Sequence, residues 1–119
     1  MIGMSYKKLQ IWVKSMDLAK KTYSVTKLFP TEEQYGLISQ MRRCSVSIPS
    51  NIAEGSQRSS DKEFSNFILI SRGSLAELET QILLSYEFEY ISSEQRDELV
   101  KLTEEIGRML HSFYSKLKA

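Results

Sequence analysis

Residues 60–89 read SDKEFSNFILISRGSLAELETQILLSYEFE and carry the longest helical pattern in the chain. Apolar or small residues recur there at spacings of three and four, so they share one face of an α-helix. They are Phe64, Phe67, Ser71, Leu75, Leu78 and Ile82. Residues 60–63 have the form of a capping box, which favours a helix start at this point. Gly73 inside the pattern costs roughly 1 kcal/mol relative to alanine, and we expect a close helix approach to offset it.

Three further segments carry the same spacing, over about residues 6–28, 31–54 and from 92 onward. Residues 31–34 and 92–95 have the form of capping boxes, and Pro30 ends the first segment because it disfavours helical backbone at the preceding residue. The periodic positions are Leu9, Trp12, Met16, Ala19, Tyr23, Ile38, Met41, Ser45, Ile48, Ile52, Leu99, Leu102, Ile106, Met109 and Phe113. Short connections favour antiparallel neighbours. The sequence therefore predicts a single all-α domain over residues 1–119, an up-down-up-down antiparallel four-helix bundle.

Pro49 lies inside the second of these segments. Proline lacks a backbone N–H and its ring crowds the carbonyl four residues earlier, here that of Ser45, so we expect a bend over Ser45–Pro49. Ile48 and Ile52 keep the core spacing across this point. The helix is therefore expected to continue to about Glu54, with Gly55 as its C-terminal stop.

The composition is that of an ordinary soluble domain. The chain has 119 residues, of which 41% are hydrophobic and 26% are charged, and this balance argues against disorder. The longest purely apolar run, residues 67–70, is far too short to span a bilayer, and residues 1–9 lack the apolar core of a signal peptide. Cys44 is the only cysteine, which excludes an internal disulfide and favours a reducing compartment. We expect a cytoplasmic protein without a membrane partner.

The formal net charge is only +1, but the two halves of the chain differ strongly. Residues 1–60 hold nine Lys/Arg and four Asp/Glu, a net charge of +5, whereas residues 61–119 hold seven Lys/Arg and eleven Asp/Glu, a net charge of −4. Such asymmetry indicates either a face for nucleic acid or two surfaces that attract each other. The charge count alone favours neither of the two.

Two of the expected helices carry a second apolar stripe at heptad spacing, about 140–150° around the helix from the first. The stripes are Ile11, Leu18 and Val25 in the first helix, and Leu69, Ala76, Leu83 and Tyr90 in the third. Scattered surface residues are the simpler explanation, but heptad spacing favours a subunit interface. Residues 6–28 carry six Lys and one Asp, a net charge of +5, and residues 61–89 carry two Lys/Arg and six Asp/Glu, a net charge of −4. We therefore expect a head-to-tail homo-oligomer that closes into a ring through these stripes.

The sequence offers no arrangement typical of catalysis or of metal binding. His111 is the only histidine, and Arg108 stands where a di-iron motif of the type Glu-x-x-His requires glutamate. Cys44 has no histidine near it in sequence, and the chain has no glycine-rich phosphate loop. We therefore expect no catalytic residue, no metal and no cofactor, and a protein that works by binding and assembly.

Basic residues are the remaining candidates for a functional site. They are Lys7, Lys14 and Lys21 at heptad spacing, Arg42 and Arg43 in the second expected helix, and Arg58 in the following loop. A positive stripe of this kind can follow a phosphate backbone, although a solvated helix face has the same pattern. The candidates predict RNA or an RNA-handling protein as partner. The alternative is a purely protein-binding scaffold whose charges are used within the oligomer.

Residues 42–55 read RRCSVSIPSNIAEG, and this string resembles the four-helix bundle proteins encoded by intervening sequences in bacterial 23S rRNA genes. The similarity extends to residues 6–9 with Trp12, to residues 63–64 and to residues 73–78. The resemblance implies a bacterial four-helix bundle that assembles as a homopentameric ring, in a family sometimes named as a ribosomal protein. A related family, the accessory protein of diversity-generating retroelements, shares the architecture and binds nucleic acid. The resemblance brings no catalytic residues with it.

Overall fold

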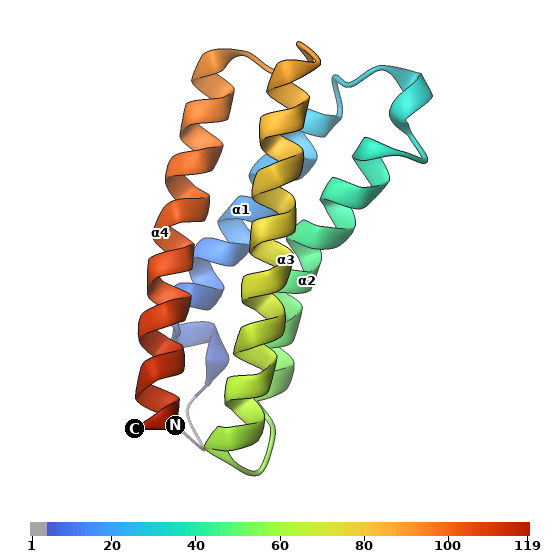
Figure 1. The fold of residues 1–119 in the computed structure, drawn as a ribbon. Coiled ribbons are helices and arrows are strands. Elements are labelled where there is room, and N and C mark those ends of the chain that lie inside the picture. Colours follow the sequence, from blue (N-terminus) through green and yellow to red (C-terminus); the bar gives the residue numbers. More distant parts are fainter. Residues whose placement is uncertain (1–4) are drawn as a thin grey trace.

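The computed structural model describes residues 5–119, and this part of the chain is built from helices alone. The α-helices are α1 (Gln10–Thr26), α2 (Leu37–Ser56), α3 (Asp61–Glu87) and α4 (Ser93–Lys118), and two short 3-10 helices, η1 (Tyr6–Lys8) and η2 (Thr31–Glu33), precede α1 and α2 (Figure 1). Residues 5–119 contain no strand, so the predicted all-α class with four helices is confirmed.

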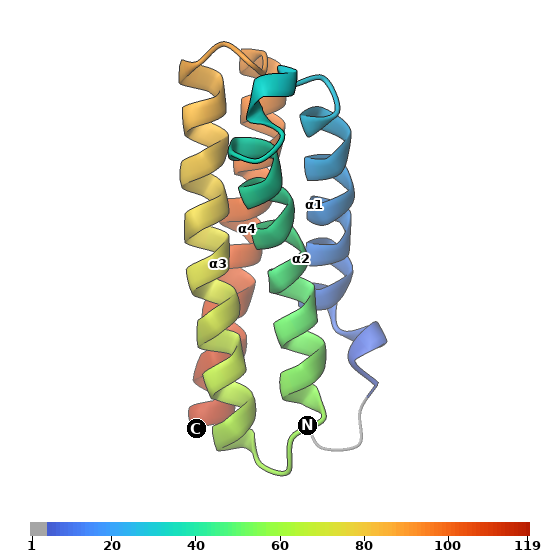
Figure 2. The same cartoon turned by 90° about the vertical axis from the view of Figure 1, so that its right-hand side faces the viewer.

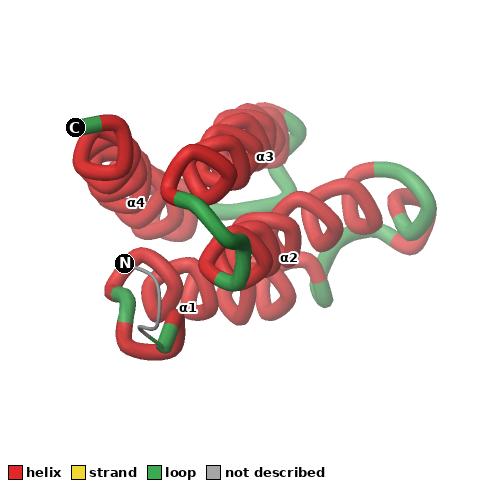
Figure 3. The backbone as a smooth tube through the Cα atoms, turned by 90° about the horizontal axis from the view of Figure 1, so that it is seen from below, coloured by secondary structure: helices red, strands yellow, loops and turns green. Residues whose placement is uncertain are grey.

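The four helices lie side by side in an elongated bundle of 43 × 24 × 20 Å. The α1–α2 and α3–α4 connections lie at one end of the bundle, and the α2–α3 connection lies at the other (Figures 1 and 2). Both α1 and α3 pack against α2 and α4, and within residues 5–119 these two helices make no close contact with each other. They therefore occupy opposite corners of the bundle (Figure 3).

Serine side chains start the last two helices. Ser92 Oγ accepts a hydrogen bond from the Gln95 N–H at 3.0 Å, and the Ser92 N–H donates to Gln95 Oε1 at 2.9 Å, which confirms the predicted capping box of α4. Ser60 Oγ likewise accepts from the Glu63 N–H at the start of α3. The capping box predicted at residues 31–34 is wrong, because these residues form η2 and the turn after it, and α2 begins only at Leu37.

The second helix passes through Pro49 and ends at Ser56, so its predicted continuation beyond the proline is confirmed. Ile48, Pro49 and Ile52 are all buried, and this packing holds the helix across the missing backbone donor. The bend expected at this point stays a prediction. Gly55 is not a stop signal, because it lies buried inside α2, where α2 packs against α3. A Cβ atom there would lie 2.6 Å from Cβ of Phe67, so the close approach of the two helices requires glycine.

The core runs the length of the bundle and contains most of the faces predicted for α2, α3 and α4. Its fully buried side chains include Met41, Ile48, Ile52, Ile68, Leu78, Ile82, Leu99, Ile106 and Leu110. Phe64 and Phe113 close it near the α2–α3 connection, where their rings meet edge to face with centroids 5.2 Å apart. For these three helices the three-four spacing therefore identified the buried face correctly.

The face that α1 turns to the core is the opposite of the predicted one. Ile11 and Leu18, which we expected at a subunit interface, are buried inside the protomer, and the exposure of Leu18 is 0%. Val25 packs against the same core. The predicted assignment of these three residues to an outward stripe is therefore wrong. Trp12 of the predicted core face is instead partly exposed.

Three hydroxyl residues explain why α1 can bury this face. Ser15, Thr22 and Thr26 are buried beside the aliphatic side chains. Each hydroxyl donates a hydrogen bond to the backbone carbonyl four residues earlier, for example Thr22 Oγ1 to Leu18 O at 2.8 Å. Because the hydroxyls are satisfied within their own helix, burying them carries little penalty.

Candidate interaction surfaces

A groove of about 580 Å³ runs between α1 and α2 on the outside of the bundle, and we call it the α1–α2 groove. Apolar and aromatic side chains form most of its lining, namely Tyr6, Trp12, Met16, Ala19, Tyr23, Val46, Pro49 and Ala53. Lys20 and Lys27 also line it and give it positive charge. Four of the five residues that sequence periodicity assigned to the core face of the first helix, all except Leu9, therefore form an open apolar surface.

The outward face of α3 is the second apolar surface, and we call it the α3 ridge. Leu69, Ile70, Leu83 and Leu84 lie on it with exposures between 42% and 50%, and Ala76 is exposed among them. This confirms that Leu69, Ala76 and Leu83 of the predicted stripe face outward. Glu77 and Glu87 are exposed on the same helix, so the ridge carries negative charge.

Gly73 lies in the middle of the α3 ridge. A Cβ atom at this position would have no neighbour within 4 Å in the described chain. The close helix approach expected at Gly73 is therefore absent from the protomer, where such an approach occurs at Gly55 instead. Gly73 lowers the helix propensity of α3, and no contact within the protomer requires a glycine there. The missing side chain lets a segment of another molecule approach the α3 backbone.

Tyr90, the last member of the predicted stripe, is used inside the protomer and not on the ridge. Its hydroxyl donates to Glu33 Oε2 at 2.8 Å, and this hydrogen bond raises the pKa of Tyr90 above its usual value. Its ring packs against Phe29 with centroids 5.2 Å apart. Tyr90 therefore holds η2 to the end of α3, and its assignment to a subunit interface stays a prediction.

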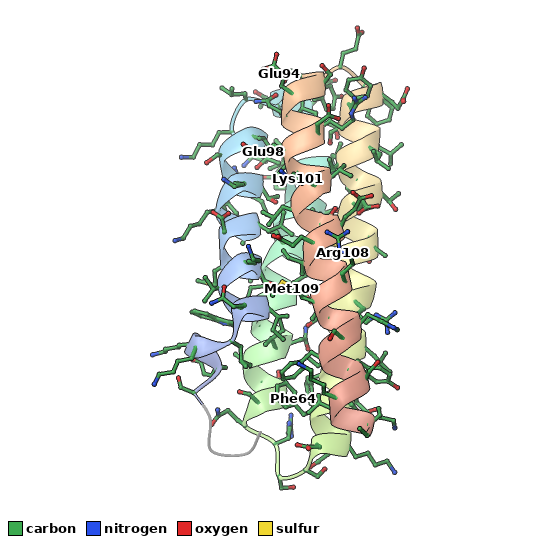
Figure 4. The ribbon with its side chains drawn as sticks, turned by 90° about the vertical axis from the view of Figure 1, so that its left-hand side faces the viewer. Phe64, Glu94, Glu98, Lys101, Arg108 and Met109 are labelled. Carbon is green, nitrogen blue, oxygen red and sulfur yellow. The ribbon has the colours of Figure 1, made fainter. Side chains whose placement is uncertain are left out.

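The outer face of α4 is charged. Glu94, Glu98, Lys101 and Arg108 are exposed along it (Figure 4). Met109 lies among them but is partly buried against the core. Mixed charge of this kind is typical of a solvated helix face. At the edge of α4 next to α1, Met109 and Phe113 line a separate pocket of about 330 Å³.

The six predicted nucleic-acid residues do not form one patch. Lys14 Nζ lies 3.0 Å from a carboxylate oxygen of Glu105 on α4, and Lys21 Nζ lies 3.7 Å from Asp17. Arg58 pairs with Glu54 at 2.8 Å and lies over the Phe67 ring. These ion pairs neutralise half of the predicted set.

Of the other three predicted residues, Lys7 lies on a different element from Arg42 and Arg43. Lys7 is exposed on η1, whereas Arg42 and Arg43 lie in the first half of α2. Arg42 lies about 21 Å from the end of α2 at Ser56, at about 1.5 Å per residue, and Arg58 lies beyond that end. Only Arg42 and Arg43 of the set share a pocket.

That pocket has a volume of about 630 Å³ and lies beside η2, between the ends of α1 and α2; we call it the end pocket. Tyr23, Lys27, Tyr35, Arg42 and Arg43 are among its lining residues. Sequence reasoning found the two arginines but missed both tyrosines. Tyr35 stands alone in a turn, without the periodic pattern that draws attention to a helix face.

Cys44 is buried and held in its neutral form. Its Sγ donates to Glu77 Oε2 at 3.1 Å and accepts from Gln81 Nε2 at 3.7 Å. Burial, followed by the interaction with Glu77, raises the pKa of the Cys44 thiol to about 11. A thiol with this pKa is a poor nucleophile at neutral pH.

Residues 5–119 contain no group of three or more His, Cys, Asp or Glu placed to hold a metal ion. His111 is exposed on α4. No helix in the same range is long and apolar enough to cross a membrane. The candidate interaction sites of the described surface are therefore the two apolar faces and the basic, aromatic end pocket.

The fold and these surfaces define an all-α four-helix bundle with two open apolar faces and a basic pocket. The sequence pattern of the 23S rRNA-intervening sequence protein family matches residues 7–112, and the chain therefore belongs to this family. The resemblance carried by residues 42–55 is thereby confirmed.

A solved relative supports the same fold. A crystal structure from Bacteroides thetaiotaomicron VPI-5482, described as a protein with unknown function from the S23 ribosomal protein family, is 28% identical to this chain. The match covers 87% of this chain and 97% of that chain, with a TM-score of 0.81. No curated protein matches the chain.

Proposed function

We propose that this chain acts without catalysis, as the up-down-up-down protomer of a ring-forming homo-oligomer that associates with RNA in the bacterial cytoplasm. The observation that carries the assembly is the pair of open apolar faces, the concave α1–α2 groove and the convex α3 ridge. Connections at alternating ends of the bundle support the topology (Figures 1 and 2). The single buried cysteine suits a reducing compartment.

The two faces suit a head-to-tail contact. They lie on different sides of one protomer, since α1 and α3 occupy opposite corners of the bundle. The α3 ridge of one copy can therefore enter the α1–α2 groove of the next, and repetition of this contact closes a ring or extends a filament. Gly73 at the centre of the ridge lets the partner's groove approach the α3 backbone.

Charge favours the same pairing. Residues 6–28 carry a net charge of +5 and residues 61–89 carry −4. Lys20 and Lys27 line the groove, whereas Glu77 and Glu87 lie on α3. Groove against groove or ridge against ridge would place like charges together, so a two-fold contact is disfavoured. A ring of five subunits is what the family resemblance implies.

RNA association rests on the family and on the basic residues that stay free of ion pairs. The alternative, a protein-binding scaffold without nucleic acid, is favoured by one observation, the internal pairing of Lys14, Lys21 and Arg58. The salt dependence of binding distinguishes the two functions. Affinity for nucleic acid falls more steeply with salt concentration for each phosphate that the protein neutralises. Retention of structured RNA that weakens steeply from about 50 to 200 mM salt supports the first function.

Light scattering on the purified chain tests the assembly. We expect a mass of several times the 13.8 kDa chain, and five times that mass for the pentamer. The ridge variant, Leu69→Glu with Leu83→Glu, should be monomeric with an unchanged circular dichroism spectrum, because both side chains are exposed in the protomer. Leu28→Glu is the matched control, since Leu28 is exposed but lies on neither surface. A wild-type chain that stays monomeric at high concentration would contradict the proposal.

A further inference from the structure

The end pocket combines aromatic rings with uncompensated positive charge. Its volume of about 630 Å³ lies between three segments, the end of α1, η2 with the following turn, and the start of α2. Polar and charged side chains contribute much of its lining, in contrast to the apolar α1–α2 groove beside it. The two sites share only Tyr23 and Lys27.

Tyr35 is the most unusual side chain of the pocket. Its exposure is 93%, in the turn between η2 and α2. No packing within the protomer accounts for an aromatic residue that is almost entirely in solvent. A free aromatic ring of this kind is a platform on which a nucleobase can stack, whatever its sequence.

Arg42 has a fixed position beside the second tyrosine of the pocket. Its guanidinium carbon lies 4.6 Å from the centroid of the Tyr23 ring, and its Nε donates to Thr26 Oγ1 at 2.9 Å. Thr26 Oγ1 in turn donates to Thr22 O at 2.8 Å, so the hydroxyl that orients Arg42 is itself oriented by α1. The guanidinium is thus presented in one place before any ligand arrives.

The positive charge of the pocket is not neutralised from within. None of Lys27, Arg42 and Arg43 lies within ion-pair distance of a carboxylate in residues 5–119. The neighbouring Glu33 is engaged elsewhere, because its carboxylate accepts from the Leu37 N–H at 3.2 Å and from the Tyr90 hydroxyl at 2.8 Å. An anionic ligand would therefore meet three cations that are not paired with a carboxylate in residues 5–119.

We infer that the end pocket binds single-stranded nucleic acid, with a base stacked on Tyr35 and the phosphates next to Lys27, Arg42 and Arg43. This inference rests on the proposed association with RNA and gives it a site. Stacked bases distinguish the ligand from a duplex, whose bases are paired and covered, and from an acidic peptide, which lacks flat aromatic bases. The basic stripe along α1 is then not the main binding face, because Lys14 and Lys21 are already paired.

Fluorescence anisotropy with a labelled 12-nucleotide oligouridine tests the site, on the full chain at 50 and 200 mM salt. Stacking on an aromatic ring is worth enough for Tyr35→Ala to weaken binding about tenfold, and Arg43→Glu should weaken it further and flatten the salt dependence. The matched controls are Phe88→Ala, an exposed aromatic residue outside the pocket, and Lys101→Glu, the same type of charge reversal on α4. Both controls should bind within about twofold of wild type. Tyr35 and Arg43 are exposed, so their variants should keep the wild-type circular dichroism spectrum.

The outcomes separate this inference from the proposed function. Binding by wild type that Tyr35→Ala and Arg43→Glu leave unchanged overturns the end pocket while the RNA association stands. Absence of wild-type binding to the oligouridine at 50 mM salt overturns the end pocket, and retention of structured RNA then decides the RNA association separately. Equal affinity for a 12-base-pair RNA duplex contradicts base stacking. Loss of assembly in Tyr35→Ala, seen by light scattering, would mean that a second copy occupies the pocket.

Discussion

Gly55 and Gly73 lie in quite different surroundings. At Gly55 a Cβ atom would lie 2.6 Å from Cβ of Phe67 and 2.8 Å from Cδ1 of Phe64, so the contact between α2 and α3 depends on its absence. At Gly73 the described chain leaves open space. Sequence reasoning assigned the close approach to Gly73 and a helix stop to Gly55. A glycine's role depends on what faces it, and a single sequence does not show this.

The same substitution should have opposite effects at the two glycines. Gly55→Ala forces Phe67 and Phe64 apart and should lower the free energy of unfolding by about 1–3 kcal/mol. Gly73→Ala should raise it by up to about 1 kcal/mol through helix propensity. Urea unfolding followed by circular dichroism measures both, in the background of the ridge variant so that assembly does not contribute. Destabilisation by Gly73→Ala there would show a contact inside the protomer.

Cys44 couples the stability of the protomer to alkaline pH. Burial and the nearby Glu77 carboxylate raise its pKa to about 11 in the folded chain, so the folded state keeps a proton that the unfolded state releases. The stabilisation is complete below about pH 9 and is lost as the pH rises toward 11. Cys44→Ala should show a smaller drop in urea midpoint between pH 8 and pH 10.5 than wild type. Equal drops in the two proteins would contradict the raised pKa.

At the scale of elements, the helices differ in how far a sequence specifies their buried face. Most of the predicted core faces of α2, α3 and α4 are buried. The first helix has two candidate faces, and the wrong one was chosen because Ser15, Thr22 and Thr26 make the buried face look polar. Their hydroxyls donate hydrogen bonds to backbone carbonyls of α1 itself. A search for apolar residues at helical spacing does not detect such hydrogen bonds. Periodicity predicted the helix, and packing decided its rotation.

Substitutions on the two faces of α1 test this rotation. Leu18→Ala should lower the free energy of unfolding by about 2–5 kcal/mol, because Leu18 is fully buried. Met16→Ala, which changes the partly exposed groove face, should cost much less in the monomeric ridge variant. Urea midpoints of the two variants measure the difference. Similar losses at both positions would mean that α1 is rotated from its described orientation.

At the scale of the whole molecule, the candidate interaction surfaces divide between the basic first half and the acidic second half of the sequence. The α1–α2 groove and the end pocket lie on the basic half of the sequence, the α3 ridge lies on the acidic half, and α4 presents mixed charge (Figure 4). Sequence reasoning predicted the charge division and the outward α3 stripe. It could not predict the groove or the pocket. Tyr23, Tyr35 and Arg43 line one pocket only because of the path that the α1–α2 connection takes from one helix to the other, and the sequence pattern does not show that path.

The central claim is that the α3 ridge of one copy docks in the α1–α2 groove of the next, and mixing two blocked variants tests it most directly. Ala19→Trp fills the groove but leaves the ridge intact, whereas Leu69→Glu with Leu83→Glu blocks the ridge but leaves the groove intact. Each variant alone should be monomeric in light scattering. An equimolar mixture should contain one groove and one ridge that still match, and should form a heterodimer of twice the 13.8 kDa chain mass that grows no further. A mixture that stays monomeric, or a blocked variant that assembles fully alone, would contradict this account.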